Sequence, residues 1–291
     1  MASAATWRSL YPFRSHELAI GAHALHYIDE GPRDSAPLLL VHGNPTWSFY
    51  WREVIQRFRS RRRVVALDHL GCGLSDKPQD WPYRLEDHIA NLERLVLSLD
   101  LKRITLGVHD WGGAIGFGFA ARHPDRIERL VILNTAAFRS RALPRRIALC
   151  RIPLLGAIVV RGLNGFARAA AFMTTTRPLP QEIRQGYLAP YGSWRDRIAV
   201  HRFVQDIPLV PTHPSYDTLL SVERGLPQFR DRPALILWGE RDWCFTPAFR
   251  EEWQRQLPAA QVHAFPGAAH YVLEDARQEA LERLGEFLEA S

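Results

Sequence analysis

The stretch Leu106-Gly-Val-His-Asp-Trp-Gly-Gly-Ala-Ile-Gly116 decides the fold of this chain of 291 residues. A run rich in β-forming residues, Arg103–His109, stops at Asp110, and an apolar stretch opened by glycines follows directly. A strand that turns this sharply into a helix holds the side chain at the turn clear of the sheet, in a strained backbone conformation. The sequence therefore predicts a strand, a tight turn at Asp110 and a helix that runs to His123.

Asp110 takes the place that a serine nucleophile occupies in most proteins with such a turn. A carboxylate is ionised at neutral pH, so it can attack an electrophilic carbon directly and form a covalent ester. An isolated aspartate at a strand end is more often a turn or helix-capping residue. The apolar strand before Asp110 and the glycines after it favour a nucleophile instead.

The rest of the chain alternates short apolar runs with stretches of helical periodicity. Strands that alternate with helices indicate a mostly parallel sheet with helices on both faces, so the predicted class is α/β and the predicted fold is that of the α/β hydrolases. The predicted strands are His16–Ile20, Ala24–Glu30, Leu38–Val41, Arg63–Leu67, Arg103–His109, Ile127–Leu133, Ala234–Trp238 and Gln261–Phe265, and the other predicted helices are Phe49–Phe58, Tyr83–Leu99 and Asp275–Leu288.

Five polar residues follow predicted strands directly or within a few positions. They are Asn44, Asp110, Asn134, Asp242 and His270. Because chemistry in open α/β sheets takes place at the carboxyl ends of the strands, we expect these side chains to gather at one edge of the sheet.

The alternation is interrupted once, between about residues 135 and 228. This segment is rich in arginine, proline and aromatic residues and is predominantly helical. We expect residues 1–134 and 229–291 to form the hydrolase core, and residues 135–228 to form a helical cap inserted after the sixth strand. Such a cap excludes water from a site and binds the apolar part of a substrate.

A covalent ester on Asp110 needs a base to direct its breakdown, and a base needs a carboxylate to orient it. His270 stands in the loop after the last strand, where this fold places its base, although a lone histidine is more often a packing residue. Asp242 follows a strand at the usual position of the acid, with Glu240 as its nearest rival. His109 and His42 are weaker candidates for the base.

The remaining need is a pair of donors for negative charge on the leaving group or oxyanion. Asn44 offers its side-chain amide, and Trp111 offers its indole N–H directly after the nucleophile. Two neutral donors in an apolar pocket stabilise a developing anion at little reorganisation cost. Ser75 lies in a glycine-rich loop without the glycine that a nucleophile elbow requires, so it is not a candidate nucleophile.

Composition narrows the remaining classes of protein. The first sixteen residues lack a secretory signal, no apolar run approaches transmembrane length, and Cys72, Cys150 and Cys244 form no metal or redox spacing. These features favour a cytoplasmic protein. We expect no cofactor and no metal.

The net charge of +6 comes almost entirely from arginine, with one concentration at Arg57–Arg63 and another at Arg139–Arg161. With no recognisable binding module, nucleic acid is not an expected partner. The apolar surface Ile152–Val160, flanked by arginines, is suited either to packing on the core or to admitting long alkyl chains and contacting a membrane or partner enzyme.

Four motifs together resemble the haloalkane dehalogenase family of α/β hydrolases, over essentially the whole chain. They are His42-Gly-Asn-Pro-Thr-Trp47, Asp68…Gly71-x-Gly-x-Ser-Asp-Lys-Pro78, His109-Asp-Trp-Gly-Gly113 and Gly267…His270. The resemblance implies that Asp110 is the nucleophile, His270 the base, Asp242 the acid, and Asn44 and Trp111 the leaving-group donors.

The branch with an acid at Asp242 and with Asn134 after the sixth strand also includes the cis-β-lactone decarboxylases of bacterial olefin biosynthesis. Their cap is similar at Cys150-Arg-Ile-Pro-Leu-Leu-Gly156, Val160-Arg-Gly-Leu-Asn-Gly-Phe166, Gly186-Tyr-Leu-Ala-Pro-Tyr191 and Phe203-Val-Gln-Asp-Ile-Pro-Leu209. This resemblance implies a hydrophobic substrate, decarboxylation of a cis-3,4-dialkyl β-lactone to a cis-alkene, and assembly with olefin-pathway enzymes.

Three alternatives to that activity stay open. The same aspartate serves a haloalkane dehalogenase, and an epoxide hydrolase would use the cap tyrosines Tyr187 and Tyr191, although Asn44 argues against it. A non-catalytic binding protein on this scaffold is disfavoured because every member of the catalytic set is present. The sequence does not decide whether Asp110 attacks the lactone carbonyl or a ring carbon.

Overall fold

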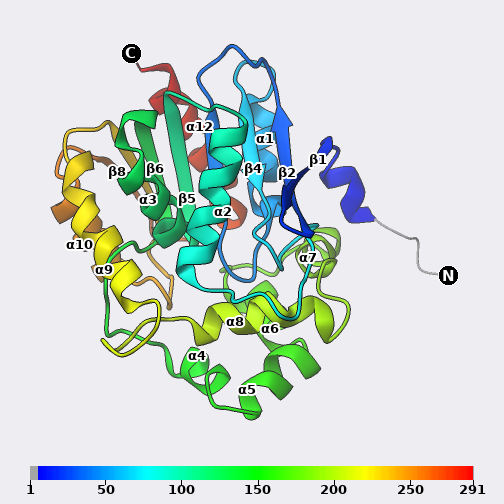
Figure 1. Cartoon of the computed structure of the whole chain (residues 1–291). Helices are drawn as coiled ribbons and strands as arrows, with labels where there is room; N and C mark the ends of the chain where they lie inside the picture. The colour runs from blue at the N-terminus through cyan, green and yellow to red at the C-terminus, as the bar shows by residue number, and fades with distance from the viewer. Residues whose placement is uncertain (1–5, 291) are drawn as a thin grey trace.

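The computed structural model describes residues 6–290. Within them, eight strands form one sheet in the order β1-β2-β4-β3-β5-β6-β7-β8 (Figure 1). β2 pairs antiparallel with β1 and β4, and the other neighbours are parallel, so the predicted α/β-hydrolase fold is confirmed. The strands are β1 (Ser15–Ile20), β2 (His23–Glu30), β3 (Leu38–Val41), β4 (Val64–Leu67), β5 (Ile104–Asp110), β6 (Ile127–Thr135), β7 (Ala234–Gly239) and β8 (Gln261–Phe265).

Helices cover both faces of the sheet because the central strands are buried on both sides. In β3, Leu39 and Val41 pack into one apolar core, and Leu38 and Leu40 pack into the other. The first core contains α2 (Leu85–Ser98), α3 (Gly112–Arg122), α9 (Tyr216–Gly225) and α10 (Pro247–Gln256), and the second contains α1 (Arg52–Phe58), α11 (Val272–Asp275) and α12 (Arg277–Glu289).

Several boundaries differ from those expected. The predicted helix 49–58 begins as a 3-10 turn, Ser48–Trp51, and α2 begins two residues later than predicted, because Tyr83 has a left-handed backbone with φ +59°. β5 ends one residue later than predicted, at Asp110, and β6 ends two residues later, at Thr135, so both strands end in polar residues. Asp110 pairs with Thr135 across a register shift, so the two strands stay joined up to the candidate nucleophile.

The chain between β6 and β7 forms a group of short helices at the carboxyl ends of the strands, below the sheet in Figure 1. They are α4 (Arg145–Cys150), α5 (Leu155–Ala157), the π-helical turn Ile158–Gly162, α6 (Gly165–Met173), α7 (Gln181–Leu188) and α8 (Ile198–Gln205). α9 comes from the same segment but lies against α2 and α3. None of the described helices is both long and apolar enough to span a bilayer.

The outer surface of α4, α5 and the following turn carries exposed apolar side chains. They include Leu149, Ile152, Leu154 and Ile158, and Leu154 is 81% exposed. Contact of this surface with a membrane or a partner enzyme stays a prediction.

Candidate active site

Asp110 ends β5, next to β3, at the point where the chain reverses its direction of progress across the sheet. Its backbone is left-handed, with φ +53°, so its side chain projects from a strained turn. The glycines after it are required by space, since a Cβ at Gly112 would overlap the carbonyl group of Val41 and a Cβ at Gly113 would overlap the side chain of Thr135. The predicted elbow is therefore present.

Two backbone N–H groups stabilise the carboxylate of Asp110. The N–H of Asn44 donates to Oδ1 over 2.6 Å, and the backbone N–H of Trp111 also stabilises the ionised carboxylate. In a serine hydrolase of this fold, these two positions form the oxyanion hole. Here the nucleophile's own Oδ1 occupies that hole, which leaves Oδ2 free to attack.

His270 and Asp242 complete a line of three side chains. Nε2 of His270 lies 3.6 Å from Oδ2 of Asp110, and Nδ1 of His270 lies 2.7 Å from Oδ2 of Asp242. Asp242 is held by two further donors, the backbone N–H of Cys244 and the amide of Asn134. The rival carboxylate, Glu240, pairs instead with Arg250.

Burial and charge pull the pKa values of this line in different directions. Burial raises the pKa of Asp110, although His270 and the backbone donors favour its ionised form. Burial disfavours protonation of His270, but the charges of Asp242 and Asp110 outweigh it and raise the pKa of His270. The arrangement therefore favours an imidazolium between two carboxylates, which keeps the nucleophile ionised.

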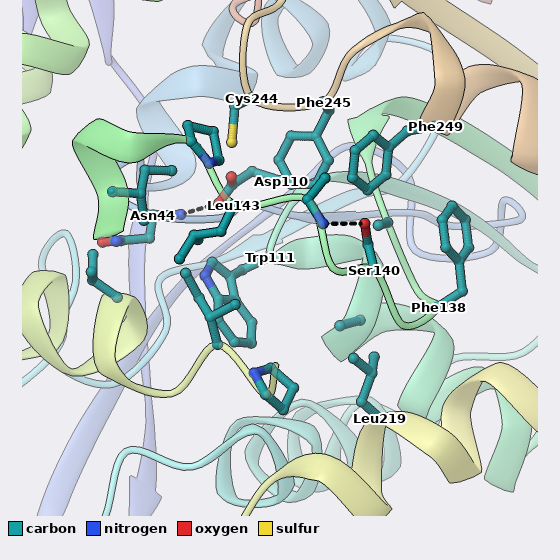
Figure 2. Close-up of a pocket in the computed structure, with 18 of the residues that line it drawn as sticks. Asn44, Asp110, Trp111, Phe138, Ser140, Leu143, Leu219, Cys244, Phe245 and Phe249 are labelled. Carbon is teal, nitrogen blue, oxygen red and sulfur yellow. Dashed lines mark hydrogen bonds between the residues drawn. The ribbon is translucent and has the colours of Figure 1, made fainter. Parts of the chain in front are cut away.

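The two predicted leaving-group donors both line the cavity beside Asp110 (Figure 2). Nδ2 of Asn44 donates to the carbonyl of Val200 over 3.2 Å, which uses one of its two N–H groups, and its Oδ1 has no partner in the described residues. The indole of Trp111 packs against Phe203, with 5.3 Å between the ring centroids.

The other sequence candidates have structural contacts. Ser75 donates to the carbonyl of Asp68, and Nε2 of His109 bonds to the carbonyl of His270. His42 is fully buried, and burial lowers its pKa. These groups hold the loops beneath the site.

Two contacts of the catalytic line were not predicted from the sequence. The sequence placed Asn134 at the active edge without a role, whereas its amide bonds directly to Asp242. The ring of Phe245 stacks on His270 with 5.6 Å between centroids. No periodic signal marks Phe245, but its position three residues after a candidate acid could have placed it near the site.

Comparisons with known proteins agree with this geometry. Residues 36–276 match the family described as alpha/beta hydrolase fold. A cis-3-alkyl-4-alkyloxetan-2-one decarboxylase from Shewanella oneidensis is 45% identical, over 96% of this chain and 90% of that protein. A protein of the same name from Xanthomonas campestris is 43% identical, over 91% of this chain and 92% of that protein.

Haloalkane dehalogenases are more distant relatives. One from Mycobacterium marinum is 33% identical over 94% of this chain and 93% of its own length. The crystal structure of one from Agrobacterium tumefaciens has a TM-score of 0.84 and 26% identity, covering 94% of this chain and 96% of that one. The chain therefore belongs to the α/β-hydrolase family, in the group that contains both the oxetanone decarboxylases and the haloalkane dehalogenases.

Proposed function

We propose that this protein is a cis-3-alkyl-4-alkyloxetan-2-one decarboxylase, which converts a β-lactone to a cis-alkene and CO2 in long-chain olefin biosynthesis. The observation that carries the proposal is the carboxylate of Asp110, buried at the meeting point of two apolar cavities with only Oδ2 free to attack. The names of the two relatives at 45% and 43% identity support the same substrate class.

The hydrogen bonds of Asp110 favour attack on a ring carbon over attack on the lactone carbonyl. Attack on a carbonyl creates an oxyanion that needs donors, and in this fold those donors are the backbone N–H groups of the oxyanion hole. Oδ1 of Asp110 already occupies that hole. We therefore propose that Oδ2 attacks C4, that the C4–O bond of the ring breaks, and that the ring oxygen leaves as part of a carboxylate.

The second step returns the enzyme to its starting state without water. The C2–C3 bond breaks and releases CO2, its electron pair forms the C3=C4 double bond, and the bond from C4 to Asp110 breaks. Inversion at C4 followed by anti elimination gives the cis-alkene from the cis-lactone. The imidazolium of His270, 3.6 Å from Oδ2, stabilises the carboxylate that leaves.

The departing carboxylate of the first step needs donors of its own. Trp111 and Asn44 line the same cavity, and in this proposal the indole N–H and the second amide N–H supply these donors. In a dehalogenase the same pair would hold a halide, and His270 would then activate the water that hydrolyses the ester. The two activities thus differ after the first step.

An epoxide hydrolase is not supported by the positions of the cap tyrosines. The hydroxyl of Tyr187 donates to Glu274 over 2.5 Å, and the hydroxyl of Tyr191 lies 3.4 Å from the carbonyl of Thr46. Both side chains are buried, and neither lines a cavity that contains Asp110.

We also propose a cytoplasmic location. Cys72, Cys150 and Cys244 are all free thiols, as expected of a protein in a reducing compartment.

The test is incubation with a synthetic cis-3,4-dialkyl β-lactone in water labelled with oxygen-18. Wild type is expected to release the cis-alkene and CO2, detected by gas chromatography, without transfer of the label to the peptide that contains Asp110. Halide release from bromoalkanes without alkene from the lactone, or label in Asp110 during lactone turnover, would contradict the proposal.

Two variants accompany this test. Asp110→Ala is expected to produce no alkene. Glu240→Gln removes a nearby carboxylate that pairs with Arg250 instead of His270, so it is expected to keep full activity. Undiminished alkene from Asp110→Ala would end the assignment of the nucleophile.

A further inference from the structure

Two cavities, not one, open from the carboxylate of Asp110. They share five lining residues: Asn44, Asp110, Ile147, Phe166 and Cys244. Counting the part open to solvent, the first encloses about 860 Å³ and the second about 940 Å³. We call them the core arm and the cap arm.

The core arm extends between the end of β6, α9 and α10. Its own lining includes Phe138, Leu219 and Phe249 (Figure 2). Ala136 also lines this arm. Phe249 and Leu219 belong to the apolar core on the α3 face of the sheet, so one side of this arm is part of that core.

The cap arm extends under α4 and α6. Its own lining includes Leu149, Val159, Ala170 and Met173. Its lining also includes Arg146, whose guanidinium lies over the ring of Trp243, 5.8 Å from the centroid. Because Leu149 and Arg146 are exposed, this arm reaches the outer surface of the cap.

Ile147 and Phe166 line both arms and stand between them. Ile147 is buried, and among the described residues Asp110 is the one carboxylate that lines either arm. Two apolar arms that diverge from one reactive carboxylate suit a substrate with two apolar chains on adjacent atoms. A substrate with one chain would fill one arm and leave the other to water.

We propose that the two alkyl chains of the lactone lie in separate arms, one in the core arm and one in the cap arm, with the ring beside Asp110. This inference rests on the proposed function and adds its specificity determinants. The bonds from C3 and C4 to the two chains splay apart, so each chain enters its own arm while Oδ2 approaches C4 on the side remote from the ring oxygen. Each methylene that leaves water raises affinity about fourfold, so the depth of each arm sets the preferred length of its own chain.

The test uses one filling substitution in each arm. Ala136→Leu shortens the core arm, and Ala170→Leu shortens the cap arm, because each alanine lines one arm only. Ala148→Leu on α4 lines neither arm and is the matched control. The substrates are two regioisomeric cis-lactones. One has a long chain at C3 and a methyl group at C4, and the other has these groups exchanged.

The expected result is a crossover. One leucine variant lowers kcat/KM at least tenfold for one member of the pair and less than twofold for the other, and the second variant does the reverse. The control leaves both values within twofold of wild type. If both variants impair the same member, or both members equally, the chains do not occupy separate arms and the proposal is wrong.

A binding experiment separates this inference from the proposed reaction. In a cis-2,3-dialkylcyclobutanone, a methylene replaces the ring oxygen, so the compound has no leaving group. The two regioisomers of this cyclobutanone, with the long chain and the methyl group exchanged, are bound to wild type and to each leucine variant. Their Kd values, measured by calorimetry, are expected to show the same crossover whether or not the lactone is decarboxylated. A crossover in binding without alkene formation would reject the proposed decarboxylation but support the placement of the two chains in separate arms. If binding shows no crossover, that placement is wrong.

Discussion

The amide of Asn134 donates to Oδ2 of Asp242 over 3.0 Å, and the same oxygen lies 2.7 Å from Nδ1 of His270. Asn134 also bonds to both backbone groups of Gly239, which fixes the orientation of its amide. It lines neither arm. Asn134 is therefore a positioning residue that acts on His270 through Asp242.

Asn134→Ala is expected to lower kcat about 10- to 100-fold, since a hydrogen bond to a charged group contributes about 1.5–3 kcal/mol. KM is expected to stay within twofold, because no arm is altered. Steady-state kinetics on the lactone measures both constants. An unchanged kcat, or a lower kcat together with a change in KM of more than twofold, would show that Asn134 does not position the acid.

The pH dependence should reflect the ionisation of Asp110. Since burial raises its pKa above the ordinary value of 3.8, kcat/KM is expected to fall on the acid side at an apparent pKa above 3.8. Asp242→Asn removes the larger of the two charges that raise the pKa of His270, so less positive charge then faces Asp110. The charge of Asp242 also raises the pKa of Asp110 directly, but this effect is smaller than that of His270. The acid limb of the variant is therefore expected at higher pH than that of wild type, together with a lower maximal rate. A limb that moves to lower pH would contradict this account of the charges.

Space around the nucleophile leads to a separate prediction. A Cβ at Gly43 would overlap Oδ1 of Asp110, so Gly43→Ala must displace the carboxylate from its backbone donors. A misplacement of about 1 Å at a reacting group can cost about 100-fold in rate, and a loss of that size is expected here. Gly267→Ala is the matched control, because its Cβ would meet no atom within 4 Å. Equal activities of the two variants would contradict the prediction.

The sheet and its edge were predictable from the sequence because short apolar runs and helical periods alternate regularly. Asp110 and His270 follow β5 and β8, and chain order within the fold assigned each a position at the same edge. The pairing of Asn134 with Asp242 was not predictable. It depends on two neighbouring strands, β6 and β7, ending at the same level.

The two arms could not be predicted from the sequence either. They are formed by α4, α6, α9 and the chain after β6, and α4 has only six residues. Helices this short have little stability of their own, so packing on the core, not local propensity, determines where their side chains lie. The sequence indicated a cap but not the division of the space beneath it.

Packing of the cap on the core depends on a buried ion pair outside the site. Arg52 on α1 forms two hydrogen bonds with Glu274, at 2.6 and 2.8 Å, and Tyr187 on α7 donates to the same carboxylate. Arg52 is 2% exposed. Glu274→Leu leaves this guanidinium buried without its main partner, so the free energy of unfolding is expected to fall by about 3–5 kcal/mol. Denaturant unfolding measures the loss.

The control removes a carboxylate from an exposed pair. Glu289 pairs with Arg61, both side chains are more than 70% exposed, and Glu289→Leu is expected to change the free energy of unfolding by less than about 1 kcal/mol. If the two variants lose similar amounts of unfolding free energy, the buried pair contributes no more to stability than the exposed one.

Acid should weaken the same buried contact. Burial opposes the ionisation of Glu274, but Arg52 and Tyr187 outweigh it and hold the pKa of Glu274 below its ordinary value of 4.5. A lowered carboxylate pKa gives stability that is complete above that ordinary value and is lost as pH falls through the folded-state pKa. The difference in unfolding free energy between wild type and Glu274→Gln is therefore expected to be largest near neutral pH and to narrow in acid. A difference that stays constant down to strongly acidic pH would show that the charge of Glu274 does not stabilise the fold, and that the contact holds the cap through packing alone.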